Sequence, residues 1–85
     1  MKNYNLGVLK ALADETRLKI LSDLKYKSRC ACELPPMVDR TQPAVSQHLK
    51  ILLKENLVEV RKKGAMRIYT LSKKGFKTLD EISTW

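Results

Sequence analysis

Four polar side chains in the segment 41–56 could read the edges of DNA bases. A glutamine both donates to and accepts from adenine, a serine contacts base or phosphate, and a lysine reaches guanine acceptors or phosphate. On a helical wheel these groups lie opposite an apolar face; they are Gln42, Ser46, Gln47 and Lys50. Composition by itself favours an ordinary solvated helix face by roughly two to one. The N-cap and the basic segment that follows weigh against this preference.

Two residues next to this polar row complete the segment. Thr41 is a good N-cap, because its hydroxyl can accept a backbone N–H of the first turn. His48 lies on the flank of the helix, where a phosphate contact and packing at the edge of the core are equally compatible with its position. We include both residues among the expected DNA contacts.

A basic run follows the helix. Its cations are Arg61, Lys62, Lys63 and Arg67, and only Glu59 opposes them. A cationic ribbon after such a helix is typical of a contact with phosphates or the minor groove. If about six to eight cations meet phosphates per dimer, affinity falls by orders of magnitude over a few-fold rise in salt.

Cys30 and Cys32 are candidate ligands for a soft metal ion, or a redox-active pair. Thiophilic ions such as As(III) favour three sulfur ligands, so a third ligand would have to come from elsewhere. On a regular helix, side chains two residues apart diverge by about 200°. Both thiols can therefore bind one ion only if Cys30 lies outside the helix or the turn is distorted. The alternative is a structural one, with two small buried residues in a packed turn.

The surrounding pattern predicts helices over about 4–13 and 15–25, a short helix from near Glu33, and a helix over 41–56. Residues 57–60 and 66–71 have strand composition and are separated by a turn at Lys63-Gly64. Asp14 is a good N-cap for the second helix, and Ser72 caps a final helix. We expect one domain over residues 1–85, mainly α with a small β-hairpin, in the order ααααββα, which is a winged helix-turn-helix.

Length and charge restrict the function further. The chain has 85 residues with 17 Lys+Arg against 9 Asp+Glu, a net charge of +8, which favours a polyanionic partner. No apolar run approaches the roughly 18 residues that a membrane span needs, and the N-terminus does not resemble a signal peptide. We therefore expect a cytoplasmic protein. Oligomerisation is a common way to stabilise so small a domain.

Two other function classes fit less well. An enzyme is not expected, because the single histidine has no evident nucleophile partner and no glycine-rich loop could cradle a phosphate. A general RNA-binding or chromatin module fits the charge, but it predicts little sequence preference and the chain offers few aromatic side chains for stacking.

Three segments together resemble the ArsR-type (ArsR/SmtB) repressor family. Residues 9–21 are similar to its LADxTRLxIL opening, residues 42–52 to its recognition helix, and residues 64–72 to its wing with the Tyr-x-Leu-Ser ending. The resemblance implies a homodimeric repressor that binds a double-stranded DNA operator. It also implies a dimer contact through the first and last helices, here the stripes Leu6/Leu9/Leu12 and Phe76/Leu79/Ile82.

The resemblance extends to Cys30-x-Cys32, which is similar to the CxC of the family's ELCVCDLC arsenic-sensing motif. It implies that As(III), Sb(III) or another thiophilic ion acts as inducer at Cys30 and Cys32, with no cofactor required. The position of the family's third thiol is occupied here by Pro35. A metal-independent or thiol-redox-responsive winged-helix regulator is the alternative. The last helix has no histidine, so the zinc-type site of some relatives is not expected there.

Overall fold

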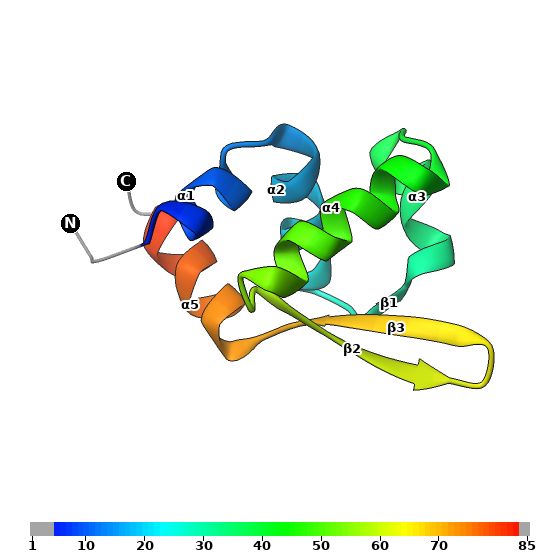
Figure 1. Ribbon diagram of the computed structural model, residues 1–85. Coiled ribbons are helices and arrows are strands. Elements are labelled where there is room, and N and C mark those ends of the chain that lie inside the picture. Colours follow the sequence, from blue (N-terminus) through cyan, green and yellow to red (C-terminus); the bar gives the residue numbers. More distant parts are fainter. Residues whose placement is uncertain (1–4, 84–85) are drawn as a thin grey trace.

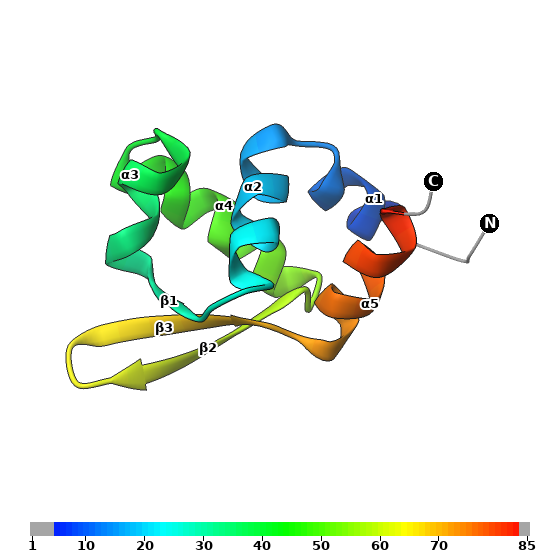
Figure 2. The ribbon, with the colours of Figure 1, turned by 180° about the vertical axis from the view of Figure 1, so that it is seen from behind.

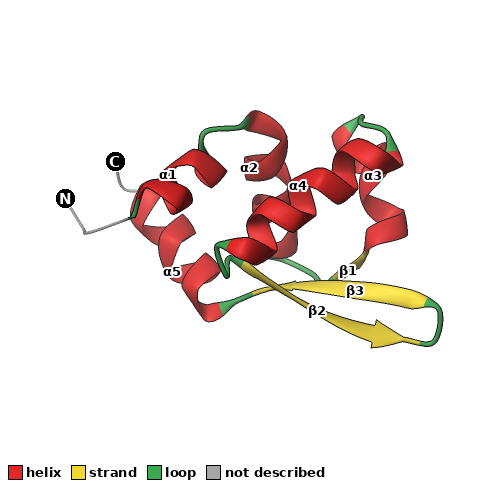
Figure 3. Cartoon of the chain, in the orientation of Figure 1, coloured by secondary structure: helices red, strands yellow, loops and turns green. Residues whose placement is uncertain are grey.

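The structure is a computed structural model that describes residues 5–83. Two helices, a short edge strand and a 3₁₀ turn precede the helix-turn-helix pair, and a hairpin and a last helix follow it (Figures 1 and 3). The elements are α1 (Leu6–Leu12), α2 (Glu15–Leu24), β1 (Arg29–Cys30), η1 (Ala31–Glu33), α3 (Leu34–Val38), α4 (Gln42–Lys54), β2 (Val58–Lys63), β3 (Met66–Leu71) and α5 (Lys73–Ile82). Within this part of the chain, every helix is too short or too polar to cross a membrane.

Side-chain caps determine where the longer helices begin. Asp14 accepts the Arg17 N–H at 2.9 Å, Thr41 accepts the Ala44 N–H at 3.3 Å, and Ser72 accepts the Gly75 N–H at 2.9 Å. Each such cap stabilises its helix by about 1 kcal/mol. The three predicted N-caps are confirmed.

One predicted boundary, in the hairpin, needs correction. The first helix begins at Leu6 in the described residues, and the expected start at Tyr4 lies outside them. The turn before α3 is a 3₁₀ helix and α3 begins at Leu34, which confirms the short helix expected from near Glu33. β2 continues to Lys63 because its residues pair with β3 up to Met66, so the turn is at Gly64-Ala65.

The sheet has a third strand that the predicted order lacks. The strand order is β1-β3-β2, with both pairs antiparallel. β1 contributes two residues, Arg29 opposite Tyr69 and Cys30 opposite Ile68. The strand that carries the first cysteine is thus hydrogen-bonded to the hairpin.

The core lies between α1, α2, α3, α4 and the base of the hairpin (Figures 1 and 2). Its largest fully buried side chains come from all of these layers; they are Ile20, Leu21, Leu34, Leu49, Leu52, Leu57, Val8 and Val45. The distal part of the hairpin projects beyond these layers, and the molecule extends 40 × 22 × 21 Å. Five helices and an antiparallel hairpin therefore form the predicted winged helix-turn-helix, with β1 added.

Candidate nucleic-acid interface

The polar row of α4 faces outward because the opposite face of the helix is held in the core. Val45, Leu49 and Leu52 are at most 2% exposed. All four residues predicted to read bases are exposed, as is Thr41 at the N-cap; they are Gln42, Ser46, Gln47 and Lys50. The structure thus brings together the helical part of the predicted site on one surface.

His48 does not share this outward direction. Its side chain is 18% exposed, and its Nδ1 lies 3.1 Å from Arg17 Nη1 and 3.9 Å from Asp14 Oδ1. Because arginine only donates hydrogen bonds, His48 Nδ1 is the acceptor in this contact. These contacts place His48 in the packing of α4 against α2, and its contact with DNA stays a prediction.

Arg17 joins three helices, and sequence reasoning missed it. Its Nε donates to the Ala11 carbonyl at 2.7 Å and its Nη2 donates to the Lys10 carbonyl at 3.0 Å, while Nη1 reaches His48. The Arg17 backbone N–H bond to Asp14 is the main reason that the pKa of this carboxyl lies below its ordinary value. The flank position of His48 was the only signal in the sequence for this contact.

The wing consists of β2, β3 and the turn between them. Its predicted cations are all exposed, namely Arg61, Lys62, Lys63 and Arg67. Lys62 pairs with Arg67 across the ladder and Glu59 pairs with Thr70, so the acid lies toward the base and the cations gather toward the tip. Gly64 occupies the turn at a φ of +62°, which glycine adopts without steric cost. The result is a ribbon with a strongly positive distal half.

A cleft of about 430 Å³ separates α4 from the wing. Three predicted base-reading residues, Gln42, Ser46 and Lys50, line one wall, and Arg67 lines the other. The cysteine pair lies in the same cleft. Its complete lining is Cys30, Ala31, Cys32, Gln42, Ser46, Leu49, Lys50, Ala65, Met66, Arg67 and Tyr69.

The two cysteines meet because Cys30 lies outside the helical turn. Cys30 has extended backbone angles (φ −67°, ψ 142°) and is the N-cap of η1, whereas Cys32 lies inside η1. Their Cα atoms are 5.1 Å apart and their sulfur atoms are joined in a disulfide. The geometric condition for a shared ion is therefore met. Cys30 is 6% exposed and Cys32 is exposed, so the pair is not simply buried packing.

Two acidic side chains fix the cysteine turn, and the sequence reading did not identify them. Glu33 Oε1 accepts the Cys30 N–H at 2.8 Å, which completes a capping box. Arg29 pairs with Asp23 of α2 through bonds of 2.9 and 3.2 Å, and these hydrogen bonds raise the pKa of the guanidinium. Arg29 also reaches Glu33 at 3.5 Å. The turn is thus attached to both α2 and β3.

The described residues offer no cluster of three His, Cys, Asp or Glu side chains around a potential metal. Pro35, at the position of the family's third thiol, lies in α3 and borders a different surface hollow, with Asp39 and Thr41. A third ligand for an ion held by Cys30 and Cys32 would therefore have to be a side chain of a different kind, or would have to come from another molecule.

An apolar surface lies at the end of the molecule opposite the wing tip, where α1 and α5 are found (Figures 1 and 2). Leu6 is 65% exposed and Phe76 is 41% exposed, while Leu9 and Ile82 are half-buried. Of the two predicted dimer stripes, these four residues are available for a partner. The other two members, Leu12 and Leu79, belong to the core instead, at 8% exposure each.

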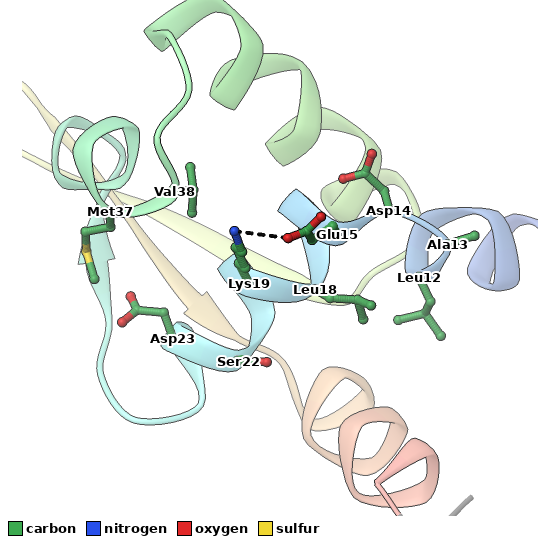
Figure 4. Close-up of a pocket in the computed structure, with 10 residues that line it drawn as sticks. All are labelled: Leu12, Ala13, Asp14, Glu15, Leu18, Lys19, Ser22, Asp23, Met37 and Val38. Atoms are coloured by element: carbon green, nitrogen blue, oxygen red, sulfur yellow. Dashed lines mark ion pairs between the residues drawn. The ribbon is translucent and has the colours of Figure 1, made fainter.

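A larger groove, of about 640 Å³, lies between α2 and α3 (Figure 4). Leu18 and Met37 contribute apolar surface, and Glu15 pairs with Lys19 at 3.2 Å along α2. The groove shares no lining residue with the cleft beside α4. We therefore do not count it as part of the candidate interface.

Known proteins resemble the chain in sequence and in structure. The model for bacterial regulatory proteins of the arsR family matches residues 14–60. An arsenical resistance operon repressor of Staphylococcus xylosus is 40% identical over 65 residues, and the match covers 76% of this chain and 62% of the repressor. The chain thus spans less than two thirds of that relative's length.

Solved structures show the same fold. HlyU from Vibrio cholerae superposes with a TM-score of 0.80 at 38% identity, over 91% of this chain and 84% of that chain. A homodimeric winged helix-turn-helix DNA-binding domain from Mycobacterium bovis superposes with a TM-score of 0.80 at 27% identity, over 92% of this chain and 72% of that chain. The matched segment contains α2, the cysteine turn, α3 and α4, and the chain belongs to the arsR family of bacterial regulatory proteins.

Proposed function

We propose that the protein is a sequence-specific transcription regulator that binds double-stranded DNA, with repression as its expected effect. The observation that carries this proposal is the joint exposure of the polar row on α4 and of the cations on the wing, on the two sides of one cleft. Membership of the family supports it. Such a regulator would act where the chromosome is, in the cytoplasm.

The two walls of the cleft suit different parts of a duplex. A helix fits the major groove, where Gln42, Ser46 and Gln47 could bond to base edges. The cations of the wing meet phosphates or the minor groove, which positions the protein without reading the sequence. Lys50 lines the cleft between them and can reach either a guanine or a phosphate.

The active form is expected to be a homodimer through α1 and α5. The exposed apolar residues Leu6 and Phe76 lie at that end of the molecule, together with a cavity of about 330 Å³ lined in part by Leu9 and Ile82. The related Mycobacterium bovis domain is described as homodimeric. Two copies would present two α4 helices to two half-sites of a palindromic operator.

The cysteine pair is the proposed switch. A thiophilic ion such as As(III) or Sb(III) would bind at Cys30 and Cys32, and the relatives named arsenical resistance repressors support this choice of inducer. Because Cys30 pairs with Ile68 of β3, a change at the sulfur atoms acts on the wing and on the cleft directly. Release of DNA would follow from displacement of the wing cations.

Thiol redox chemistry is the second candidate for the switch. It is favoured by one specific observation, namely that the two sulfur atoms lie close enough to be joined in a disulfide. Oxidation would lock the turn and reduction by a dithiol would free it. This form of regulation needs no third ligand, which is its advantage over a metalloid at a two-cysteine site.

The test starts from selection of binding sites out of random duplexes with the reduced full chain. Affinity for the selected site and for a scrambled duplex is then measured by fluorescence anisotropy at several salt concentrations. We expect strong preference for the selected site and a steep salt dependence, because cations release condensed counterions. Equal affinity for both duplexes, or affinity independent of salt, would refute the proposed DNA recognition.

The same complex tests the switch. As(III), Sb(III) and peroxide are each added to the complexes of the wild type and of Cys30→Ser/Cys32→Ser. The variant should bind DNA like the wild type and should not be released. If the variant is released as readily as the wild type, the cysteines are structural.

A further inference from the structure

A methionine also lines the cleft beside the cysteine pair. Met66, the first residue of β3, is 44% exposed and lines the cleft together with Cys30 and Cys32. The strand register brings it close: Cys30 lies opposite Ile68, and Met66 is two residues before Ile68. In an antiparallel pair such diagonal neighbours share one face, at about 7–8 Å, within reach of long side chains.

The three sulfur atoms differ in charge, and this difference selects the metal. A thiolate carries a negative charge and a thioether carries none, and both are soft ligands that select Cu(I). A methionine side chain has three rotatable bonds, so it can adjust to a metal held by two neighbouring thiolates. As(III) gains little from a neutral thioether, because it needs anionic sulfur.

From this juxtaposition we infer that Cys30, Cys32 and Met66 form a binding site for a monovalent soft ion, with Cu(I) as its representative. The two thiols each lose a proton to solvent, and the metal keeps its oxidation state. When the cysteines form a disulfide, a dithiol reductant must first supply two electrons and two protons. The site deepens the proposed switch, and its link to DNA release depends on the proposed function.

The charges around the site explain how occupancy would act on DNA binding. Two thiolates, one thioether and one Cu(I) together carry a net charge of −1. Lys50 and Arg67 line the same cleft, so they are the nearby cations available to neutralise it. A cation that pairs with the metal site is less available to a phosphate. The metal would also tie the cysteine turn to the first residue of β3, in addition to the ladder pairs at Arg29 and Cys30.

The chain provides a matched control for Met66. Met37 of α3 is 45% exposed, almost the same as Met66, and it borders the α2–α3 groove instead of the cleft (Figure 4). Replacing either methionine by leucine keeps the volume and removes the sulfur. A difference between Met66→Leu and Met37→Leu therefore reports the ligand and not the loss of a surface methionine.

The experiment titrates the reduced full chain with Cu(I) under anaerobic conditions, in competition with a chromophoric Cu(I) chelator. The wild type and Met37→Leu should bind one Cu(I) with three sulfur neighbours in X-ray absorption spectra. Met66→Leu should retain two sulfur neighbours and bind on the order of tenfold more weakly, about 1.4 kcal/mol. Selenomethionine labelling should add a Cu–Se distance in Met37→Leu and not in Met66→Leu.

Several results would overturn the inference. Equal Cu(I) affinity and equal sulfur coordination in Met66→Leu and Met37→Leu would show that Met66 is not a ligand. If Cys30→Ser binds Cu(I) as tightly as the wild type does, the proposed site does not bind the metal. The affinity for As(III) should be the same in both methionine variants, since a thioether contributes little to it. The affinity of the metal-free protein for the selected duplex separates the DNA-binding proposal from the Cu(I) site. If the metal-free wild type does not prefer this duplex, the proposed function is refuted. The Cu(I) titration tests the site independently of DNA.

Discussion

The recognition helix α4 and the wing contribute to one surface but are supported in different ways. α4 buries Val45, Leu49 and Leu52 in the core, so its outward face is fixed by packing on the opposite side. The wing is exposed from Glu59 to Arg67, and its distal half is held mainly by the cross-strand ladder. Figure 3 shows this hairpin extending away from the helices.

This difference matches the two tasks proposed for the surface. Base edges differ from one base pair to the next, so a group that reads them must keep its register. Phosphates repeat along the backbone, and a ribbon that opens locally can still find them. The buried support of α4 would thus serve sequence specificity, and the locally flexible wing would serve general affinity for DNA.

The largest effect should come from removing the support of α4. Leu49→Ala leaves a cavity at a side chain that is 2% exposed, and such truncations cost about 2–5 kcal/mol. The matched change in the wing, Val60→Ala at 40% exposure, should cost under about 0.5 kcal/mol. Urea unfolding followed by circular dichroism measures both. Similar costs for the two variants would contradict the difference in support.

Specificity should depend on α4 more than on the wing. Gln47→Ala removes a candidate bond to a base edge, and a good bidentate contact is worth about 1–3 kcal/mol of discrimination. The affinity for the selected duplex should fall while the affinity for a scrambled duplex stays nearly the same. His48→Ala should act through stability instead, because His48 contacts α2. If Gln47→Ala weakens both duplexes equally, Gln47 contacts phosphate.

Capping of α2 should support α4 with a characteristic pH dependence. Asp14→Ala should cost about 1 kcal/mol of unfolding free energy at neutral pH, because the Arg17 N–H loses its acceptor. The same hydrogen bond lowers the pKa of Asp14 below its ordinary 3.8 in the folded state. The stabilisation is therefore fully present above 3.8 and is lost as the pH falls through the folded pKa.

Unfolding curves of the wild type and Asp14→Ala at a series of pH values should accordingly converge in acid. Asp14→Asn provides the control, since an asparagine can cap the helix and does not titrate. A gap between the wild type and Asp14→Ala that stays constant down to the lowest pH would show that the ionised carboxylate is not what stabilises the turn.

The smallest effect should come from a single cation of the wing. Lys62→Gln removes one exposed charge opposite Arg67. Binding to selected and scrambled duplexes should weaken alike, by roughly a few-fold, and the salt slope should fall by about 1. Anisotropy titrations at several salt concentrations measure both quantities. A loss confined to the selected duplex would mean that Lys62 reads bases.

Features set by neighbouring residues could be predicted from the sequence. The caps at Asp14, Thr41 and Ser72, the apolar face of α4 and the basic hairpin depend on spacings of a few residues. β1 could not be predicted, since a two-residue strand has no periodicity and exists only through its partner in β3. The ring of His48 and the neighbourhood of Cys30 and Met66 also depend on segments that are far apart in the chain.

The position of β2 at the outside of the sheet has a consequence for the free protein. β1 and β2 both flank β3, so β2 leaves one row of backbone donors and acceptors for solvent along its outer edge. Such an edge is a template for pairing with another chain, and charged side chains, lysine especially, oppose that pairing. Arg61, Lys62 and Lys63 lie on this strand. The residues proposed to hold DNA would therefore also keep unbound molecules from joining strand to strand.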